Sequence, residues 1–212
     1  PDIKILLYRS GIGKSYEEEE FVDRITHNFD DVLNPSIQAA ILTSPANQHI
    51  NQAISLIKSN KHVLIEKPLS NSTDKIDELL KLQRNKNSVV LVGYCLRYLP
   101  DAQMVYNYAN TALNDILNVR VEVGSYLPSW RKKDYKSAVS SLSDLGGGVL
   151  LELSHEFDYL HWFFGHMKNI YAEINFSNTL GIEVEDSVDL IFNSGKNFTI
   201  SMHLDFNTHT PR

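Results

Sequence analysis

The residues with the clearest chemical potential lie in one segment, GGGVLLELSHEFDYLHWFFG, which spans residues 146–165. At about 100° per residue, its apolar side chains fall on one stripe of a helix, the spacing of a core-facing surface. The polar and aromatic side chains fall together about 150° away from that stripe. They include a carboxylate, an imidazole and a phenol, which can transfer a proton and hydrogen-bond a substrate. A solvated surface helix has the same pattern. The apolar stripe consists of Leu153, Phe157, Leu160 and Phe164, and the polar face consists of Glu152, His155, Tyr159, Trp162 and His166.

A second candidate is Lys67 in the sequence Glu66-Lys67-Pro68, which directly follows an apolar strand-like run. Proline fixes the chain at this point, and the bond before it can be cis, which would direct Lys67 into a cleft. An ammonium beside a substrate hydroxyl can polarise the oxygen, and partial burial would lower the pKa of the lysine. The competing interpretation is a surface loop with a solvated Lys–Glu pair.

The histidines and the cysteine do not form a metal or hydrolase motif. The chain has eight histidines, but His155, His161 and His166 lack the H-E-x-x-H spacing, so a metal site is not expected. No G-x-S-x-G nucleophile elbow is present. The single cysteine, Cys95, excludes an internal disulfide and fits a reducing cytoplasm. Because Cys95 ends an apolar run, we predict a buried and unreactive thiol.

Composition places the chain among ordinary soluble globular proteins. Of 212 residues, 42% are hydrophobic and 22% are charged, which argues against disorder. The net charge of -6 and the absence of a basic, aromatic-rich patch argue against nucleic acid as a partner. No apolar run has the length of a membrane span, so a membrane partner is not expected. No signal-peptide pattern is visible, so we expect a cytoplasmic location.

The first half of the chain alternates apolar strand-like runs with helical patterns, which is typical of an α/β fold with a doubly wound parallel sheet. Ser15 and Glu18 form a capping box that predicts a helix over residues 16–25. Ser72 or Thr73 can cap a later helix. The predicted strands are 3–8, 37–43, 62–65 and 89–92; one predicted helix carries Ile50, Ala53, Ile54 and Ile57 on its core face, and another carries Ile76, Leu79 and Leu80.

After Pro100 the pattern changes to a helix over 101–113 followed by strictly alternating runs. This alternation predicts an α+β domain whose mostly antiparallel open sheet has one covered face. The boundary falls near 97–100, which gives a domain of residues 1–98 and a domain of residues 99–212. The alternating residues are Val119, Val121 and Val123, then Ile170, Ala172, Ile174 and Phe176, then two runs within 184–206 joined by a hairpin turn at 193–196.

Four segments in this order resemble the Gfo/Idh/MocA family of NAD(P)-dependent oxidoreductases. They are TSPANQHI (43–50), HVLIEKPLS (62–70), VGYCLRYLP (92–100) and the glycine-triplet helix at 146–165. The intervening YLPSWRKKDY (126–135) resembles a subgroup associated with sugar and nonulosonate biosynthesis. The resemblance implies a partial Rossmann-like dinucleotide-binding domain followed by a partial substrate-binding and oligomerisation domain.

The resemblance also implies roles for individual residues. Lys67 and His155 would handle the proton of a substrate hydroxyl, and Glu152 would orient them. Many members have an aspartate four residues before the histidine, whereas this chain has Leu151 there and Glu152 one position later. For His49, the alternative to cofactor binding is a structural role in packing. The cofactor-binding set is Arg9, Ser10, Ser44, Pro45, Asn47, His49, Glu66 and Lys67, and the substrate-binding set is Tyr94, Arg97, Trp130, Arg131, Tyr135 and Tyr159.

The glycine-rich turn that opens a dinucleotide fold is not visible. The only early glycine pair, Gly11 and Gly13, does not have the G-x-G-x-x-G spacing. The chain begins on what resembles the second strand of such a fold, so we interpret it as an internal fragment. Arg9 at the end of this strand leans towards the 2′-phosphate of NADP, while NAD stays open.

The predicted function is hydride transfer between NAD(P) and a hydroxyl or ketone of a sugar-like small molecule. One alternative is a non-catalytic sugar- or nucleotide-binding regulator on the same scaffold. Another is a fragment that binds cofactor poorly and has lost catalysis. A homo-oligomer, either dimer or tetramer, is expected from the resemblance and from the sheet face that a one-sided sheet exposes.

Overall fold

The computed structural model describes residues 3–11, 15–112, 115–132 and 134–210. Gly13, the end of the helix predicted over 101–113, and the C-terminal arginine lie outside the described residues. The chain divides into two compact units. The first unit comprises residues 1–43, 48–65 and 73–91, and the second comprises 44–47, 66–72 and 92–212. Within the described residues no helix has the length and apolar character needed to cross a bilayer.

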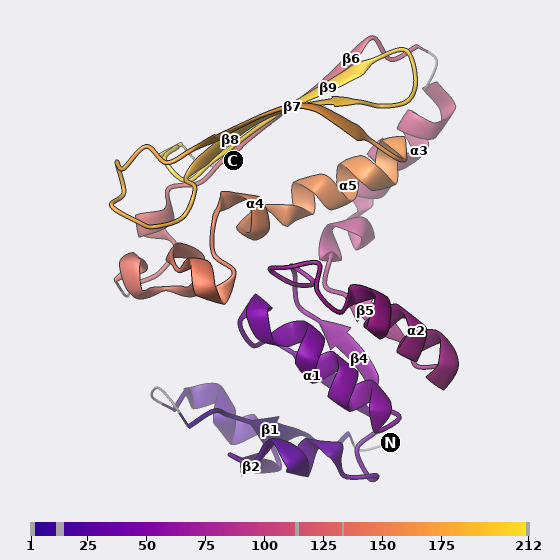
Figure 1. The fold of residues 1–212 in the computed structure, drawn as a ribbon, viewed down its shortest axis with the longest axis vertical. Helices are drawn as coiled ribbons and strands as arrows, with labels where there is room; N and C mark the ends of the chain where they lie inside the picture. Colours follow the sequence, from indigo (N-terminus) through magenta and orange to yellow (C-terminus); the bar gives the residue numbers. More distant parts are fainter. Residues whose placement is uncertain (1–2, 12–14, 113–114, 133, 211–212) are drawn as a thin grey trace. The chain divides into compact units, whose positions relative to one another are not determined.

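The first unit contains two parallel sheets (Figure 1). Strand β1 (Leu6–Tyr8) pairs in parallel with β2 (Arg24–Thr26). Strands β3 (Ala39–Leu42), β4 (His62–Ile65) and β5 (Val90–Val92) form the second sheet with β4 in the middle.

The helix predicted over residues 16–25 is wrong. A short 3-10 helix, η1 (Glu17–Phe21), occupies part of this segment, and β2 follows it. The backbone amide of Tyr16 donates to the Glu19 carboxylate at 3.0 Å, so the capping contacts join Tyr16 and Glu19 rather than Ser15 and Glu18. Because the segment contains a run of glutamates and buries none of the side chains of η1, little apolar packing is available to extend the helix.

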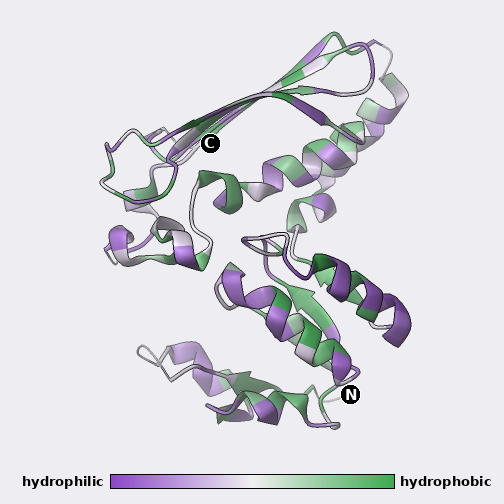
Figure 2. Cartoon of the chain, viewed as in Figure 1, coloured by the Kyte–Doolittle hydropathy of each residue, from purple (hydrophilic) through white to green (hydrophobic). Residues whose placement is uncertain are grey.

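Two helices accompany the three-stranded sheet. Helix α1 (Ala46–Lys58) buries the predicted core face, and Ile57 is fully buried. Helix α2 (Ile76–Lys86) buries only Leu79, and Figure 2 shows hydrophilic residues along much of its length. The predicted cap by Ser72 or Thr73 is wrong, because Lys75 in a left-handed conformation precedes α2 without a side-chain cap.

The second unit is built on a four-stranded mixed sheet. Its strands are β6 (Asn118–Gly124), β7 (Lys168–Asn175), β8 (Ser187–Asn193) and β9 (Thr199–Asp205), in the order β6-β9-β8-β7. Strand β6 pairs with β9 in parallel, while the other two pairings are antiparallel. The predicted hairpin between the last two strands is confirmed, and its Gly195 has a positive φ of 68°.

Helices cover one face of this sheet, as Figure 1 shows for α4 (Val149–Glu152) and α5 (Ser154–Phe164). Alternate residues of β8 and β9 are buried against them in one hydrophobic core. Helix α3 (Pro100–Ala112) lies against α5, where Tyr106 and Trp162 stack with ring centroids 4.6 Å apart. The core thus fixes the helical segment that carries the predicted chemistry.

The segment predicted as one helix is interrupted at Leu153. Leu153 has φ -98° and ψ 35°, which ends α4 and lets α5 begin at the next residue. Glu152 and His155 therefore lie on different helices and not on one continuous helix face. Cys95 also differs from its prediction, because it begins the 3-10 helix η3 (Cys95–Tyr98) and its thiol is exposed.

Candidate active site

Lys67 forms the central contact of the candidate site, and it is made with Glu152 at the end of α4. The Lys67 ammonium donates to the backbone carbonyl of Glu152 at 2.8 Å and lies 3.2 Å from its Oε2. The two side chains retain only 22% and 17% of their exposure. Because both groups are partly shielded from water, this charge-assisted contact is stronger than an exposed pair. The Lys67–Pro68 peptide is cis, as the sequence allowed.

The glycine triplet lets other parts of the chain pack closely against its backbone. A Cβ on Gly146 would lie 2.8 Å from the Ala46 Cβ, and a Cβ on Gly147 would lie 2.5 Å from the carbonyl oxygen of Val139. The same loop supplies Ser140, whose hydroxyl donates to Oε1 of Glu152 at 2.7 Å. Both carboxylate oxygens of Glu152 are therefore engaged, one by a serine and one by Lys67.

His155 lies in the first turn of α5, with Tyr94 beside it. The two rings are edge to face, with centroids 5.6 Å apart. Burial is the larger influence on Tyr94 and raises the pKa of its phenol above the ordinary value, while the neighbouring Ser154 hydroxyl acts in the opposite direction. Tyr94 is therefore a neutral proton donor near neutral pH. His155 is partly buried. Its imidazole, the Tyr94 phenol and the hydroxyl of the adjacent Ser154 lie together at this end of α5.

Arg97 forms a two-point ion pair with Asp158, one turn along α5 from His155. Its Nε and Nη2 donate to the two carboxylate oxygens at 2.8 Å and 2.6 Å. The guanidinium also lies over the Trp162 ring, 5.6 Å from the centroid. The hydrogen bond that Arg97 donates to Asp158 raises the pKa of the guanidinium above its ordinary value. This guanidinium is thus largely committed within the protein.

The other predicted substrate contacts also lie in the second unit, where most of them have partners within the protein. Trp130 donates its indole N–H to Ser125 at 2.7 Å, and Tyr135 donates its hydroxyl to the carbonyl of Leu180 at 2.8 Å. Both side chains pack against the hydrophobic core. Arg131 is exposed. The Tyr159 ring packs against Phe163, with centroids 5.5 Å apart. Their predicted contact with a substrate stays a prediction.

Five predicted cofactor residues, Lys67 among them, lie in the short segments of the second unit that follow strands β3 and β4. Asn47 donates its amide to the carbonyl of Asp144 at 2.8 Å, which ties the start of α1 to the loop before the glycine triplet. The Glu66 carboxylate accepts from the Lys67 amide at 3.2 Å. Ser44 and Pro45 are partly buried. These segments follow the carboxyl ends of parallel strands, the edge at which α/β proteins bind ligands.

The remaining predicted cofactor residues lie in the first unit. Arg9 directly follows β1, pairs with the Glu19 carboxylate and has its guanidinium 5.5 Å from the centre of the Tyr16 ring. Ser10 is exposed beside it, and His49 is 1% exposed inside α1. The burial of His49 agrees with packing as its role.

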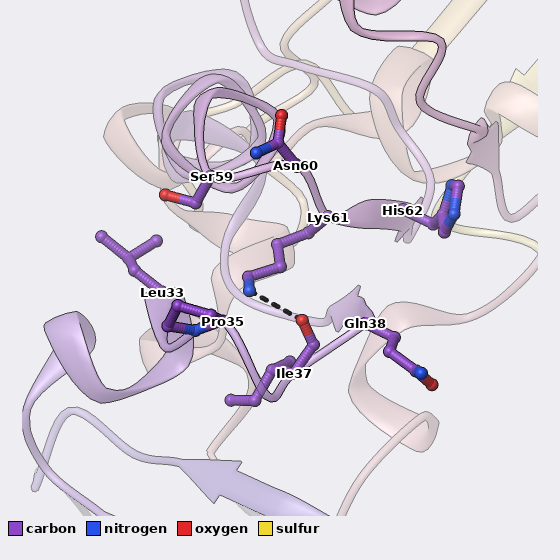
Figure 3. A pocket seen from close by; sticks show the side chains of 8 residues that line it. All are labelled: Leu33, Pro35, Ile37, Gln38, Ser59, Asn60, Lys61 and His62. Atoms are coloured by element: carbon purple, nitrogen blue, oxygen red, sulfur yellow. Dashed lines mark hydrogen bonds between the residues drawn. The ribbon is translucent and has the colours of Figure 1, made fainter.

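A cavity of about 630 Å³ lies elsewhere in the first unit, next to the amino ends of β3 and β4. Figure 3 shows Lys61 reaching from the start of β4 towards the carbonyl of Ile37, to which its ammonium donates at 2.7 Å. It also donates to the carbonyl of Asn34 at 2.5 Å. Lys61 therefore ties two loops together, and none of the predicted site residues lines this cavity. The described residues contain no group of three or more His, Cys, Asp or Glu arranged to hold a metal ion.

Sequence reasoning missed three residues around the site. Asp158 could have been found, because it follows His155 by three residues and so lies on the same side of a helix. Ser140 and Glu185 carried no local signal, because each comes from a loop distant in sequence from the glutamate or helix that it contacts. Only the folded chain brings them to α4.

Comparison with known proteins agrees with this architecture. Residues 7–94 match the oxidoreductase family with an NAD-binding Rossmann fold, and residues 108–212 match the GFO/IDH/MocA C-terminal domain. An uncharacterized oxidoreductase of Synechocystis is 30% identical over 81% of this chain and 47% of its own length. The scyllo-inositol 2-dehydrogenase (NADP(+)) IolW of Bacillus subtilis is 26% identical over 66% of this chain and 41% of its own length.

Among solved structures, levoglucosan dehydrogenase in complex with NADH and levoglucosan has the same fold. The TM-score is 0.83 at 17% identity, over 98% of this chain and 59% of that protein. The fold and the site thus define a protein with a Rossmann-like parallel sheet and a mixed-sheet domain. The chain belongs to the Gfo/Idh/MocA family of oxidoreductases. It spans about half the length of the curated relatives that it matches.

Proposed function

We propose that this chain forms part of an enzyme that transfers a hydride between NAD(P) and a CH–OH group or ketone of a sugar-like substrate. The observation that carries the proposal is the Lys67 ammonium, which Glu152 holds by two contacts in the same unit as His155 and Tyr94. A lysine with a purely structural role would not need an imidazole and a phenol nearby. The nicotinamide would accept or supply the hydride, and the protein must manage the proton on oxygen.

Lys67 is the residue that we assign to the substrate oxygen. An ammonium has three donor hydrogens, and the described contacts with Glu152 use two of them. The third can donate to a hydroxyl or ketone oxygen and stabilise negative charge there. His155 would accept the hydroxyl proton on oxidation or return it on reduction, as a group that titrates near neutral pH can. Glu152 holds the lysine in place.

The chemistry of the residues fits a dinucleotide, and several of the predicted cofactor residues, among them Arg9 and Asn47, also have partners within the chain. Ser44, Pro45 and Glu66 follow the carboxyl ends of strands, where main-chain and polar groups can meet a ribose. The lean towards NADP depends on Arg9, and the ion pair with Glu19 offsets the charge that would attract a 2′-phosphate. We therefore propose NAD(P) without a choice between the two forms.

A sugar-like substrate is favoured by the side chains near His155 and by the relatives. Aromatic rings such as Tyr94 and Tyr159 suit the faces of a carbohydrate ring. Relatives named for scyllo-inositol and levoglucosan act on polyhydroxylated rings. Because the Arg97 guanidinium is already paired, we propose that hydroxyl recognition matters more here than recognition of a carboxylate or phosphate. A cytoplasmic, homo-oligomeric enzyme of carbohydrate metabolism is part of the same proposal.

The test is steady-state turnover of the intact protein with NAD⁺ and NADP⁺ against inositols and anhydro-sugars, followed at the absorbance of the reduced nicotinamide. Lys67→Met should lower kcat by roughly a hundredfold or more, because it removes the charge on the substrate oxygen. Its affinity for the cofactor, measured by fluorescence titration, should change little. His155→Gln should lower kcat by a similar or smaller factor.

Lys58→Met is the matched control, since Lys58 makes an exposed pair with Glu78 in the first unit. It removes the same charge and should retain the original turnover. Full activity of Lys67→Met on every substrate that the original protein oxidises would overturn the assigned role. Cofactor-dependent turnover that is absent throughout, despite measured binding of a sugar, would instead favour a binding protein.

A further inference from the structure

We propose that Glu185, in the segment before β8, is a positioning residue that holds α4 so that Glu152 can hold Lys67. The inference rests on the proposed function and deepens it, because it names a residue that acts on the site without touching the substrate. Glu185 is distant in sequence from both members of the Lys67–Glu152 pair. The contacts that join them run through the first turn of α4.

Glu185 binds the start of α4 with two different acceptors. Its backbone carbonyl accepts from the Val149 amide at 3.2 Å, and its Oε1 accepts from the Leu150 amide at 3.1 Å. The first amides of a helix have no partner within the helix, so an outside acceptor must satisfy them. Glu185 therefore supplies the cap that Gly148, which has no side chain, does not.

The lack of a side chain at Gly148 leaves room for the Glu185 carboxylate. A Cβ at this position would lie 2.3 Å from Oε1 and 2.5 Å from Oε2 of Glu185. Gly148 also has φ +108°, a conformation that residues with side chains rarely adopt. The third glycine of the triplet is thus matched to an acid that packs directly on the backbone.

Helix α4 has only four residues, so its start and its end move together. The Glu152 amide donates to the carbonyl of Gly148 at 3.0 Å, which closes the single turn. Lys67 then binds Glu152 through both the backbone carbonyl and the carboxylate. A shift of the first turn would therefore displace two acceptors of the Lys67 ammonium at once.

Ser140 also contacts this turn. Its carbonyl accepts from the Gly148 amide at 3.0 Å, and its hydroxyl donates to Glu152 Oε1 at 2.7 Å. Helix α4 is thus held both by the loop of Ser140 and by Glu185. Ser140 contacts the Glu152 carboxylate directly, whereas Glu185 acts only through the backbone.

The partly buried environment of Glu185 disfavours a charged carboxylate. Burial raises the pKa of its carboxyl, so the folded protein bears a desolvation cost at this position. The Leu150 amide acts in the opposite direction and favours the ionised form. The hydrogen bond that the carboxylate accepts from the Leu150 amide offsets part of this cost, which explains why an acid occupies the position.

The first experiment measures the reactivity of Lys67 in this chain and needs no enzyme activity. Glu185→Ala, Glu185→Gln and the original chain are exposed briefly to an acylating reagent, and the modification of Lys67 is measured by peptide mass spectrometry. Glu185→Ala should raise the rate at Lys67 by roughly fivefold, as expected for the loss of one ordinary hydrogen bond. Glu185→Gln retains an acceptor for Leu150 and should react like the original chain.

Glu183→Ala is the matched control, because Glu183 lies two residues earlier in the same loop and is exposed. It should leave the reactivity of Lys67 unchanged. Should Glu185→Ala lose its circular dichroism signal, Glu185→Asp replaces it; this variant keeps the charge but withdraws the oxygens from Leu150, and the same rise is expected. An unchanged rate at Lys67 in a folded Glu185→Ala or Glu185→Asp protein would overturn the inference.

The second experiment uses the intact protein in the turnover assay. Glu185→Ala should lower kcat while the KM for the nicotinamide cofactor stays the same, and Glu185→Gln should restore kcat. A loss of stability without repositioning would lower the amount of active protein and leave kcat per folded molecule intact. If Lys67→Met retained turnover while Glu185→Ala still changed the labelling of Lys67, the proposed function would fail and the positioning would stand. If Lys67→Met were inactive and the labelling did not change, only the positioning would fail.

Discussion

Arg97 donates two hydrogen bonds to Asp158, and this pairing changes what its substitution should do. The family resemblance implies that Arg97 contacts the substrate, whereas the structure joins it to a carboxylate whose side chain is 10% exposed. Arg97→Ala would leave that carboxylate without its cation. We expect the free energy of unfolding to fall by about 2 kcal/mol, the cost of stranding a charged acceptor. Urea denaturation followed by circular dichroism measures it.

The double variant Arg97→Ala with Asp158→Ala separates pairing from packing. Removing both partners leaves no stranded charge, so the double variant should be more stable than the sum of the two single variants predicts. The Arg97 side chain also covers Trp162, so some loss should persist. Strictly additive effects would show that the ion pair contributes nothing to the free energy of unfolding. Arg97 would then again be a candidate for contact with the substrate.

Glu185 gives stability a defined pH dependence. Burial raises the pKa of its carboxyl above the ordinary value of 4.5, so the folded state binds this proton more tightly than the unfolded state. The resulting stability is fully present below about pH 4.5 and is lost as the pH rises through the folded pKa. Glu185→Gln does not titrate. Its stability relative to the original protein should therefore be lower at about pH 4 than at about pH 7, as measured by urea unfolding.

Glu183→Gln is the comparison for this pH series, since Glu183 is exposed. Its difference in unfolding free energy from the original protein should be the same at both pH values. A difference for Glu185→Gln that does not vary with pH would mean that the carboxyl has the same proton affinity in the folded and unfolded states.

At the scale of single elements, the interruption at Leu153 decides the geometry of the site. Helical periodicity correctly predicts the buried side chains Leu153, Leu160 and Phe164, because apolar burial depends on local spacing. It does not predict that α4 ends at Glu152. The start of α4 in turn depends on two contacts from loops outside the helix, the Glu185 carboxylate at Leu150 and the Ser140 carbonyl at Gly148. Sequence spacing contains no information about either loop.

Gly148 and Gly165 provide a matched pair for testing the start and the end of these helices. Both have positive φ, 108° and 81°, but a Cβ on Gly165 would meet nothing within 4 Å. Gly165→Ala should cost about 1–2 kcal/mol of unfolding free energy through backbone strain alone. Gly148→Ala adds the collision with the Glu185 carboxylate and should cost about 3 kcal/mol or more. Thermal and urea unfolding of both variants measure the difference.

Gly148→Ala should also raise the acylation rate of Lys67, since it displaces the residue that caps α4, whereas Gly165→Ala should not. Equal losses of stability in the two variants, with equal reactivity of Lys67, would show that the Glu185 carboxylate adapts to the new methyl group. The close packing of Gly148 would then have no bearing on the Lys67–Glu152 pair.

At the scale of the whole chain, the succession of elements could be predicted and the pairing of strands could be predicted only in part. Alternation predicts β6, β8 and β9, since one face of each is buried in the core. The parallel pairing of β6 with β9 was not predicted, because alternation is the same in parallel and antiparallel strands that expose one face. Strand β2 was also missed, because its three residues lie in a segment with a helix-like capping signal.

The outer face of the four-stranded sheet is where we expect copies of the chain to associate. Tyr171 on β7 pairs directly with Ile191 on β8, so both point away from the helices, and they are 50% and 38% exposed. Polar neighbours on this face are already paired with each other, as His203 is with Asp189 at 2.8 Å. Light scattering of the purified protein should therefore give a multiple of the chain mass. Ile191→Asp places a charge in the centre of this face and should shift the mass to that of one chain. Leu117→Asp alters a side chain that is 84% exposed outside the sheet and should leave the assembly intact. An unchanged mass for Ile191→Asp would place the contact between copies on another surface.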